Sequence, residues 1–270
     1  MKVWINGRIV EAAGAVDADD RGVTLGDGIF ETLAVIDGVP LRFDRHLARL
    51  TSGAEVLGIP IPVGAAALND AICGVCGAEN VTEGSARITL LRGPAPRGVQ
   101  PPDDPRPTLM ITAASGTVGH AMPVRAIIAT CTRRNDLSPL AGVKSTNYLD
   151  AILATREARD AGADDAILLN TRGMVAEATA ANIFCVINGD LVTPPLSDGA
   201  LPGIMRACVM ETETVTERSV SVDDLKAADE VFLTSSLGIR PVAGLDGDAV
   251  GDGTPGPVAA RLGDLPRLAG

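Results

Sequence analysis

Short stretches in which every second residue is apolar alternate along this chain with longer stretches in which apolar residues recur three or four positions apart. The first spacing is typical of half-buried strands and the second of amphipathic helices. The chain opens with two short apolar runs on either side of Asn6-Gly7, a pair that favours a tight two-residue turn. The pattern therefore predicts a β-hairpin over the first eleven residues.

The same spacing predicts the remaining elements, which alternate between strands and helices. We expect further strands at 29–36, 39–43, 86–91, 109–113, 124–130, 165–169, 183–187, 191–192 and 230–234. We expect helices at 45–57 with Asp44 as N-cap, 69–76, 147–161, 203–213, 221–227 and 258–262. The segments 17–28 and 92–107 are predicted to be loops.

Alternating strands and helices predict the α/β class, in its mixed α/β (α+β) form. The Gly- and Pro-containing segment 116–123 is predicted to link a small N-terminal α/β domain, 1–115, to a larger C-terminal mixed α/β domain, 124–270. A length of 270 residues suits two domains, and no internal repeat is visible.

The composition narrows the function. Hydrophobic residues make up 46% of the chain and aromatic residues only 2%, so aliphatic side chains must form most of the core. The net charge is −11, the isoelectric point is near 4.6, and no Lys/Arg cluster is long enough to follow a phosphodiester backbone. Nucleic-acid binding is therefore disfavoured.

Neither a signal peptide nor a membrane span is expected, because the first residues lack a continuous apolar segment and no later apolar run is long enough. Five cysteines, an odd number, indicate reduced thiols and a cytoplasmic protein. The lone pair Cys73 and Cys76 is best explained as small buried residues of a helix, so no metal is expected. Only two histidines, His46 and His120, are present, which weakens the case for zinc or Ser-His-Asp hydrolysis.

The region between 137 and 210 carries the most informative chemistry. Lys144 precedes an apolar-periodic helix, Glu177 comes after a turn, and a second helix begins after Pro202-Gly203 with free backbone amides. A lysine amine can bond covalently to a phosphorylated pyridine aldehyde, a carboxylate can hold its ring nitrogen protonated, and a helix N-terminus can bind its phosphate. These residue types alone make such a site only a candidate.

Six segments, in their order along the chain, strengthen this interpretation. They are LGDGIFET (25–32), HLARL (46–50), AGVKSTNYL (141–149), GMVAEATAANIF (173–184), TPPLSDGALPGIMR (193–206) and TSSLGIRPV (234–242). Together they resemble the class IV aminotransferase family, the fold-type IV enzymes that use pyridoxal 5'-phosphate. This family includes branched-chain aminotransferase, D-amino-acid aminotransferase and 4-amino-4-deoxychorismate lyase.

The resemblance implies a two-domain fold-type IV architecture with pyridoxal phosphate in the cleft between the domains, and a homodimer. It also implies that Lys144 binds the cofactor covalently and then acts as the base. By the same resemblance, Glu177 pairs with the pyridine nitrogen and Arg49 with the phosphate, and Tyr148 lies near the phenolic oxygen. A structural role for Arg49, an ion pair with Asp44 or Glu55, is the alternative.

The phosphate-binding set implied by the resemblance also includes the backbone amides at the start of the second helix and the hydroxyls or amides of the TSS run. Its members are Ile204, Met205, Thr234, Ser235 and Ser236.

Substrate contacts are implied for Phe30, Arg92 and Arg97. D-Amino-acid aminotransferases have a tyrosine where this chain has Phe30, and their Arg-x-His carboxylate-binding motif is absent. These departures argue against specificity for D-amino acids.

The family chemistry begins with removal of a proton from the carbon that bears nitrogen, and its members differ in the fate of the resulting carbanion. The length, the N-terminal segments and the LRGPAPRG loop favour 4-amino-4-deoxychorismate lyase, which forms pyruvate and 4-aminobenzoate for folate biosynthesis. The TPPLSDGALPGIMR and GPVAARL segments are equally similar to branched-chain aminotransferases. The alternative is therefore an aminotransferase for branched-chain L-amino acids or D-amino acids, with 2-oxoglutarate or pyruvate as acceptor. A non-catalytic relative that binds a phosphorylated ligand is a more remote alternative.

Overall fold

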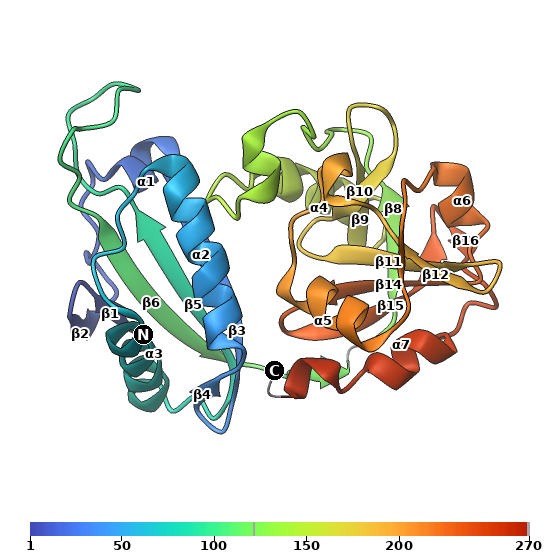
Figure 1. Cartoon of the computed structure of the whole chain (residues 1–270), viewed down its shortest axis with the longest axis horizontal. Coiled ribbons are helices and arrows are strands. Elements are labelled where there is room, and N and C mark those ends of the chain that lie inside the picture. The colour runs from blue at the N-terminus through green and yellow to red at the C-terminus, as the bar shows by residue number, and fades with distance from the viewer. Residues whose placement is uncertain (121, 269–270) are drawn as a thin grey trace. The chain divides into compact units, whose positions relative to one another are not determined.

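The chain forms two compact units in a computed structural model that describes residues 1–120 and 122–268, with the backbone alone at His120 (Figure 1). The first unit comprises 1–118 together with the loop 143–147, and the second comprises 119–142 and 148–268. The predicted linker 116–123 includes Ala121, which lies outside the described residues. The loop that contains Lys144 thus groups with the N-terminal part of the chain.

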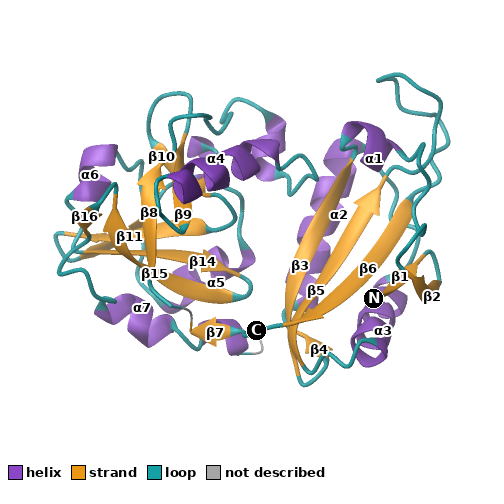
Figure 2. Cartoon of the chain, turned by 180° about the vertical axis from the view of Figure 1, so that it is seen from behind, coloured by secondary structure: helices purple, strands orange, loops and turns teal. Residues whose placement is uncertain are grey.

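The first unit is built on a six-stranded sheet with the order β2-β1-β6-β5-β3-β4, in which all neighbours are antiparallel. Its strands are β1 (Lys2–Ile5), β2 (Arg8–Glu11), β3 (Gly28–Ile36), β4 (Val39–Pro40), β5 (Glu83–Leu91) and β6 (Thr108–Ser115). Its helices are α1 (Arg21–Leu25), α2 (Phe43–Leu57) and α3 (Ala65–Ala78). Figure 2 shows α2 and α3 against the long strands β3, β5 and β6.

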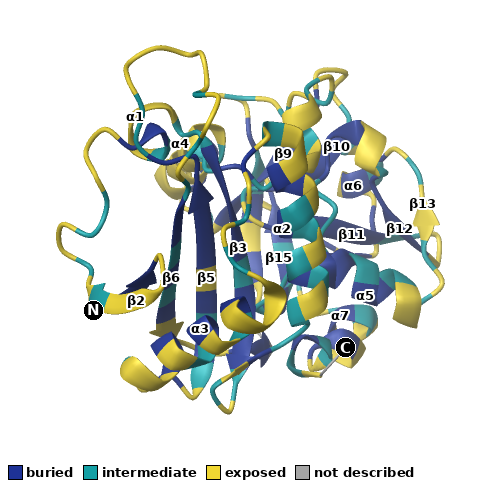
Figure 3. Cartoon of the chain, turned by 60° about the vertical axis from the view of Figure 1, so that its left-hand side comes forward, coloured by how far each residue is buried: buried dark blue, intermediate teal, exposed yellow. Residues whose placement is uncertain are grey.

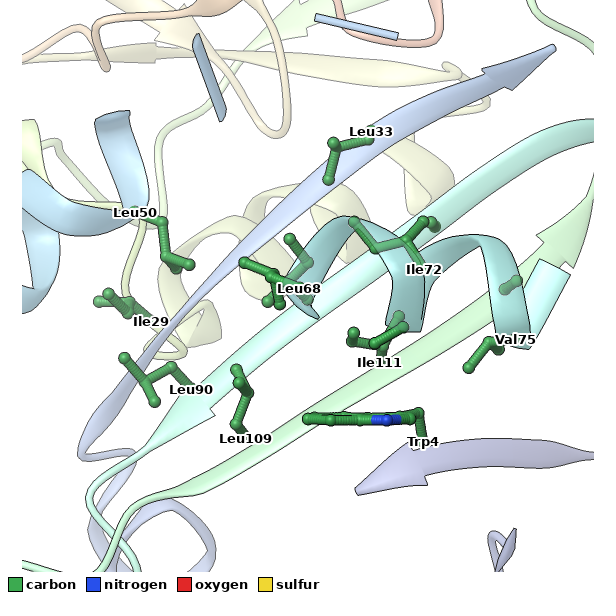
Figure 4. Packing of buried hydrophobic residues seen from close by; sticks show 14 of the residues in the cluster. Trp4, Ile29, Leu33, Leu50, Leu68, Ile72, Val75, Leu90, Leu109 and Ile111 are labelled. Atoms are coloured by element: carbon green, nitrogen blue, oxygen red, sulfur yellow. The ribbon is translucent and has the colours of Figure 1, made fainter. Parts of the chain in front are cut away.

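One face of this sheet forms the core of the unit with α2 and α3. Ile29 and Leu33 of β3 pack in the same buried cluster as Leu50 of α2 and Ile72 of α3 (Figure 4). Figure 3 shows β5 almost entirely buried and α3 with an exposed outer face. Because side chains alternate along a strand, Phe30 lies on the opposite face of the sheet, away from these helices.

The N-terminal hairpin is confirmed, with Ile5 opposite Arg8 and positive φ angles of 44° and 97° at Asn6 and Gly7. A two-residue turn with both central φ angles positive matches the twist of the flanking strands, which is why Asn-Gly is favoured there.

The predictions around α2 are wrong in part. Strand β4 ends at Pro40, because Arg42 adopts a left-handed conformation and α2 begins at Phe43. Asp44 therefore lies in the first turn of the helix and is not its N-cap. The predicted loop 17–28 contains α1, which is capped by the Asp20 side chain.

The second unit is built on a larger mixed sheet with the order β10-β9-β8-β15-β14-β11-β12-β13, and β7 and β16 also pair with β15. Its strands are β7 (Gly119–His120), β8 (Val124–Ile128), β9 (Asp165–Leu169), β10 (Val175–Ala178), β11 (Asn182–Ile187), β12 (Asp190–Thr193), β13 (Thr216–Glu217), β14 (Glu230–Ser235), β15 (Gly238–Leu245) and β16 (Asp248–Ala249). Its helices are α4 (Leu149–Asp160), α5 (Ile204–Thr212), α6 (Val222–Lys226) and α7 (Pro257–Leu262), with 3₁₀ turns at Pro139–Gly142, Leu196–Asp198 and Leu265–Arg267. The predicted mixed α/β class is confirmed.

Separate apolar clusters hold the layers of this unit together. Phe184 and Phe232 stack on adjacent strands with ring centroids 5.2 Å apart, in a cluster that also contains residues of α5 and α7. Ala154 and Ala158 of α4 pack closely against β9 in another cluster. Across the described part of the chain, no helix combines the length and apolar character needed to cross a membrane.

Candidate active site

The loop 143–147 is fixed along the first residues of β3. The backbone N–H of Phe30 donates to the carbonyl of Lys144 at 2.9 Å, and that of Thr146 donates to Gly28 at 2.9 Å. Val143, one residue before the lysine, is buried in the core of the first unit. Backbone pairing and an apolar anchor therefore hold Lys144 at a defined position, as a reactive lysine requires.

The Lys144 side chain lies over the ring of Phe30, and a second cation, Arg87, packs against the same ring. Its Nζ is 4.6 Å from the centroid of Phe30, and the guanidinium carbon of Arg87 is 3.6 Å from the same centroid. The face of an aromatic ring attracts cations electrostatically. The first unit therefore presents a lysine and an arginine around one buried phenylalanine, which was predicted to contact substrate.

Arg87 was not predicted from the sequence. It lies on β5, where Thr32 of β3 is its cross-strand partner, and its Nε donates to Thr89 at 3.3 Å. Alternation along β5 could have placed Arg87 and Thr89 on one face. Only the pairing of β3 with β5 brings that face to Phe30.

Arg49 lies on α2 and forms an ion pair with Glu31 of β3. Its Nε and Nη2 donate to the two carboxylate oxygens at 2.8 and 2.7 Å. The imidazole Nδ1 of His46, also on α2, lies 2.6 Å from the same carboxylate. The partner of Arg49 in this ion pair is Glu31, whereas the alternative drawn from sequence proposed Asp44 or Glu55.

Burial and the neighbouring charged groups determine the ionisation of Glu31 and His46. Burial opposes ionisation of Glu31, but hydrogen bonds from Arg49 and His46 outweigh it and lower the pKa of the carboxyl. Burial lowers the pKa of His46, although the neighbouring Glu31 acts in the opposite direction. The cluster therefore consists of an ionised carboxylate, a neutral imidazole and a guanidinium.

Glu177 lies in the second unit on β10, next to a β-bulge between Val175 and Glu177. Its Oε1 is 3.0 Å from Nε of Arg134, and its Oε2 accepts the backbone N–H of Leu201 at 2.9 Å. Arg134 also donates to two backbone carbonyls, those of Ala141 and Gly199. A carboxylate held at both oxygens and paired with a cation is suited to accept a further hydrogen bond while ionised.

Arg134 is a functional candidate that the sequence reasoning missed. It lies ten residues before Lys144, in the stretch after β8, where no local pattern indicated a partner. Its role depends entirely on the fold of the second unit.

The predicted phosphate-binding residues of the second unit gather at the start of α5. Gly203 is the N-cap, and Ile204 and Met205 are the first two residues of the helix. Thr234 of β14 is opposite Asn182 of β11, and a Cβ on Gly203 would lie only 1.9 Å from Oδ1 of Asn182. The helix N-terminus and these two strands are therefore in close contact.

The hydroxyl of Thr234 is a buried polar group beside the start of α5. The residue is only 2% exposed, and Oγ1 has no hydrogen-bond partner among the residues that the structure describes. Buried polar atoms are nearly always hydrogen-bonded, so this oxygen fits a role as donor to a bound group. A buried unsatisfied hydroxyl beside a helix N-terminus suits the phosphate of pyridoxal phosphate.

The remaining predicted residues lie on several elements. Ser235 Oγ accepts the N–H of Leu237 at 3.3 Å, and Ser236 is the next residue, in the turn between β14 and β15. Tyr148 is the half-buried N-cap of α4. Arg97 is exposed in the loop between β5 and β6.

Arg92 is buried within the first unit. It contacts Asp27 through Nε and Nη2 at 2.7 and 3.0 Å and donates to the carbonyls of Leu57 and Gly58. Burial opposes ionisation of Asp27, but the hydrogen bonds from Arg92 and Arg21 outweigh it and lower the pKa of the carboxyl. These contacts join β3, α2 and β5 and favour a structural role for Arg92 over the predicted contact with substrate.

Comparison with known proteins agrees with this arrangement. The sequence profile described as amino-transferase class IV matches residues 28–245. The chain is 34% identical to a Methanocaldococcus jannaschii protein provisionally named a branched-chain-amino-acid aminotransferase, over 97% of this chain and 94% of the relative. It is 31% identical to the D-alanine aminotransferase of Bacillus licheniformis, over 97% of this chain and 94% of that enzyme.

Solved structures are similar over nearly the whole chain. The branched-chain amino acid aminotransferase of Escherichia coli superposes with a TM-score of 0.91 at 28% identity, covering 97% of this chain and 92% of that one. A Legionella pneumophila protein provisionally named 4-amino-4-deoxychorismate lyase superposes with a TM-score of 0.82 at 35% identity, covering 93% and 94% of the two chains.

Fold and site together define an enzyme of fold-type IV that depends on pyridoxal phosphate. The chain belongs to the class IV aminotransferase family. The resemblance found in the sequence is thereby confirmed, and so is the cofactor that it implied.

Proposed function

We propose that this enzyme is a 4-amino-4-deoxychorismate lyase, which releases pyruvate and 4-aminobenzoate for folate biosynthesis. The single observation that carries this choice is the 35% identity with the Legionella protein of that provisional name, over more than nine-tenths of both chains. The resemblance of the segments around LGDGIFET and LRGPAPRG to the lyase supports the same choice.

In this proposal several residues have different roles towards the cofactor. Pyridoxal phosphate supplies an electron sink for the carbon that bears the substrate nitrogen. Lys144 would hold the cofactor covalently, and its amine would serve as the base that takes the proton from that carbon. The fixed position of Lys144 beside Phe30 supports this role. The pairing of Glu177 with Arg134 supports a role in which Glu177 keeps the pyridine nitrogen protonated.

The phosphate is proposed to bind Arg49 and the start of α5. Supporting observations are the buried hydroxyl of Thr234 and the amides of Ile204 and Met205 at the helix N-terminus. Ser235 and Ser236 complete the proposed set on the same turn, and Tyr148 is proposed to lie near the phenolic oxygen. A planar guanidinium and helix amides both suit a phosphate dianion.

The substrate is proposed to be a small amine that carries carboxylates. The exposed guanidinium of Arg87, on the same ring as Lys144, supports this class because it offers a cation close to the reacting lysine. Phe30 and Arg97 are proposed to line the substrate site with it. Arg92 acts at most indirectly, through Asp27 and the ends of α2 and β5.

An aminotransferase is the second candidate. It is favoured by the M. jannaschii and B. licheniformis relatives, whose names specify branched-chain and D-alanine aminotransferases. Both reactions begin with the same proton removal, so the groups around Lys144 serve either one.

The test is a product assay on purified holoenzyme with 4-amino-4-deoxychorismate and no keto-acid acceptor. The lyase predicts pyruvate and 4-aminobenzoate in equal amounts over many turnovers. If neither product forms, and an amino acid converts the cofactor to its aminated form, the protein is an aminotransferase. Panels of branched-chain L-amino acids and D-amino acids would then identify the donor.

A Lys144→Ala variant serves as the matched control, because it keeps the fold and removes the amine. Borohydride reduction should attach the cofactor to the Lys144 peptide in the native protein and leave the variant unlabelled. The non-catalytic alternative would be supported if the protein binds the cofactor without such labelling and converts neither 4-amino-4-deoxychorismate nor an amino acid.

We also propose that the enzyme is a cytoplasmic homodimer, since the resemblance to the family implies a dimer and the composition suggests the compartment. Light scattering of the purified holoenzyme would measure the mass, and a single-chain mass of 27.6 kDa would contradict the dimer.

A further inference from the structure

The long loop between β5 and β6, residues 92–107, is held by a single buried arginine. Arg21, the first residue of α1, is only 4% exposed. Its Nη1 donates to the carbonyls of Gly98 and Gln100 at 2.8 and 3.2 Å, and its Nη2 donates to the carbonyl of Val99 at 3.0 Å. These three consecutive residues, the tip of the loop, therefore turn their carbonyls towards one guanidinium.

Further contacts fix Arg21 itself and the base of the loop. Its Nε donates to Asp27 at 2.8 Å, which gives the buried charge a carboxylate partner. Its backbone N–H donates to the carbonyl of Gly93 at 3.0 Å, at the start of the same loop. A Cβ on Gly93 would lie only 1.8 Å from the carbonyl oxygen of Arg106, so the two ends of the loop are in close contact. Arg21 thus holds the loop at its base and at its tip.

These contacts require a guanidinium. Arginine presents five N–H donors in one plane, and here Nε meets the carboxylate while Nη1 and Nη2 meet the carbonyls. A loop without regular secondary structure loses about 1–2 kcal/mol of conformational freedom for each residue that is ordered. The contacts with Arg21 order the tip within the folded protein, before any ligand binds.

Arg97 comes directly before this tip and is exposed, so a dissolved carboxylate can reach it. Arginine binds carboxylates best through two parallel hydrogen bonds, which demand a defined position of the guanidinium. Because Arg97 and Gly98 share a planar peptide unit, the contact at the carbonyl of Gly98 also restricts the backbone of Arg97.

We propose that Arg21 is a positioning residue for the substrate, which it influences through the loop tip and Arg97 without touching the substrate itself. This inference rests on the contact with substrate proposed above for Arg97. A side chain whose backbone is already held in place loses less conformational freedom when a ligand binds, so its anchor contributes to affinity. Such an anchor favours the bound substrate and the transition state equally, so its loss changes KM more than kcat.

The experiment compares the steady-state kinetics of the native holoenzyme and its Arg21→Lys variant with 4-amino-4-deoxychorismate as substrate. The ammonium keeps the positive charge beside Asp27 but lacks the planar fork that engages the carboxylate and the carbonyls together. KM should rise about tenfold while kcat stays within a factor of about two. A native KM, or a fall in kcat as large as the rise in KM, would overturn the proposal.

Proteolysis measures the loop directly. Trypsin cleaves after arginine, and the exposed bond between Arg97 and Gly98 lies at the start of the tip. Because mobile loop tips are cut faster than ordered ones, the Arg21→Lys variant should be cleaved there about tenfold faster than the native enzyme. Faster cleavage together with an unchanged KM would reduce Arg21 to a structural role.

A double-mutant cycle tests whether the effect passes through Arg97. Arg97→Gln should raise KM, and Arg21→Lys should cause no further rise in that background. If Arg97→Gln raises KM and Arg21→Lys does not, the present inference fails alone. If Arg97→Gln has no effect, the proposed role of Arg97 fails and this inference fails with it.

Failure of the lyase proposal gives a different result. In that case the native enzyme converts an amino acid and leaves 4-amino-4-deoxychorismate unchanged. An amino acid also carries a carboxylate, so the same comparison with that amino acid tests the role of Arg21 independently of the lyase reaction.

Arg218→Lys is the matched control. Arg218 lies in the second unit and donates to the carbonyl of Ser219 and the carboxylate of Asp224, so the substitution changes the same kind of contacts away from the loop. This variant should keep the native KM and the native rate of cleavage after Arg97.

If Arg21→Lys does not fold, Gly98→Ala changes the tip from its exposed side. Gly98 has a φ angle of 131°, which residues with a Cβ rarely adopt, and an added Cβ there meets nothing within 4 Å. The variant should therefore fold, shift the tip and raise KM with kcat nearly unchanged. A native KM in this variant would contradict the proposal.

Discussion

At the scale of single residues, the groups proposed for catalysis are each fixed by two or more contacts. Lys144 is held by backbone pairing with β3, and Glu177 by Arg134 and the amide of Leu201. Such contacts limit the geometries that a side chain can adopt before substrate binds, and pre-organised groups stabilise a transition state without further rearrangement. In the proposed roles, these contacts are the contribution of each unit's fold to catalysis.

Glu177→Gln should lower kcat by about 10²–10³-fold, because a neutral amide stabilises a protonated pyridine nitrogen less well than a carboxylate does. Cofactor should still bind, because the phosphate contacts are unchanged. Steady-state rates and the absorption spectrum of the bound cofactor would measure both effects.

Glu213→Gln is the surface control for this prediction. Its carboxylate pairs with the exposed Arg261, so the rate should stay within a factor of two or so of the native value, as for most exposed ion pairs. A Glu177→Gln enzyme with a native rate would show that this carboxylate has no part in the chemistry.

At the scale of elements, the start of α5 depends on close packing. Gly203 has a φ angle of −70° and a ψ angle of 138°, which are ordinary values for the residue before a helix. Any residue could therefore adopt its backbone conformation. The requirement for glycine comes instead from the side chain of Asn182, whose amide nitrogen donates to Leu201 at 2.8 Å.

Gly203→Ala should destabilise the protein by about 1–3 kcal/mol, as overpacking does, and weaken binding of pyridoxal phosphate because the start of α5 must shift. Urea denaturation and cofactor titration would measure these effects. Removing the Asn182 side chain in the Gly203→Ala background should restore part of the affinity. Gly77→Ala in α3, where a Cβ meets nothing within 4 Å, should leave affinity unchanged.

A second element-scale feature is the link between α4 and the segment after β8. Glu157 of α4 accepts the backbone N–H groups of Thr130 and Cys131 and the hydroxyl of Thr130. The hydrogen bond from the Thr130 side chain is the largest cause that lowers the pKa of Glu157, from an ordinary 4.5 to about 2.

This shift predicts a pH-dependent contribution to stability. A carboxyl whose pKa is depressed in the folded state stabilises the fold above its unfolded value and loses that contribution as the pH falls. The difference in unfolding free energy between the native protein and Glu157→Gln should be full above pH 4.5 and shrink as the pH falls towards 2. Urea titrations at about pH 6 and about pH 3 would measure it, and an equal difference at both values would contradict the assignment.

At the scale of the whole molecule, each unit has its own sheet and its own apolar core. Lys144 and Arg49 belong to the first unit, and Glu177 and the start of α5 belong to the second. A ligand that binds only the folded state stabilises every part of the protein that contributes to its binding.

Pyridoxal phosphate added to apoprotein should therefore slow amide hydrogen exchange in both 143–147 and 201–206. Mass spectrometry of exchanged peptides would measure the protection, with the N-terminal hairpin at 2–11 as an internal reference that should not change. Protection at only one of these two segments would contradict the proposed role of the other.

The sequence by itself determined features that depend on neighbouring residues. Asn6-Gly7 predicted the hairpin, the apolar spacing at 45–57 most of α2, and the apolar run at 165–169 the strand β9. The motifs around Lys144 and Glu177 identified the family and the cofactor, because these segments resemble those of the family and follow the same order along the chain.

Only the tertiary structure decided which distant residues meet. Pairing of β3 with α2 gives Arg49 the partner Glu31, and pairing of β3 with β5 brings Arg87 to Phe30. Folding of the second unit likewise places Arg134 beside Glu177. Local patterns of apolar spacing encode the faces of single elements, whereas these contacts depend on which faces pack together. Burial of the whole core determines which faces pack together. No short segment of the sequence contains that information.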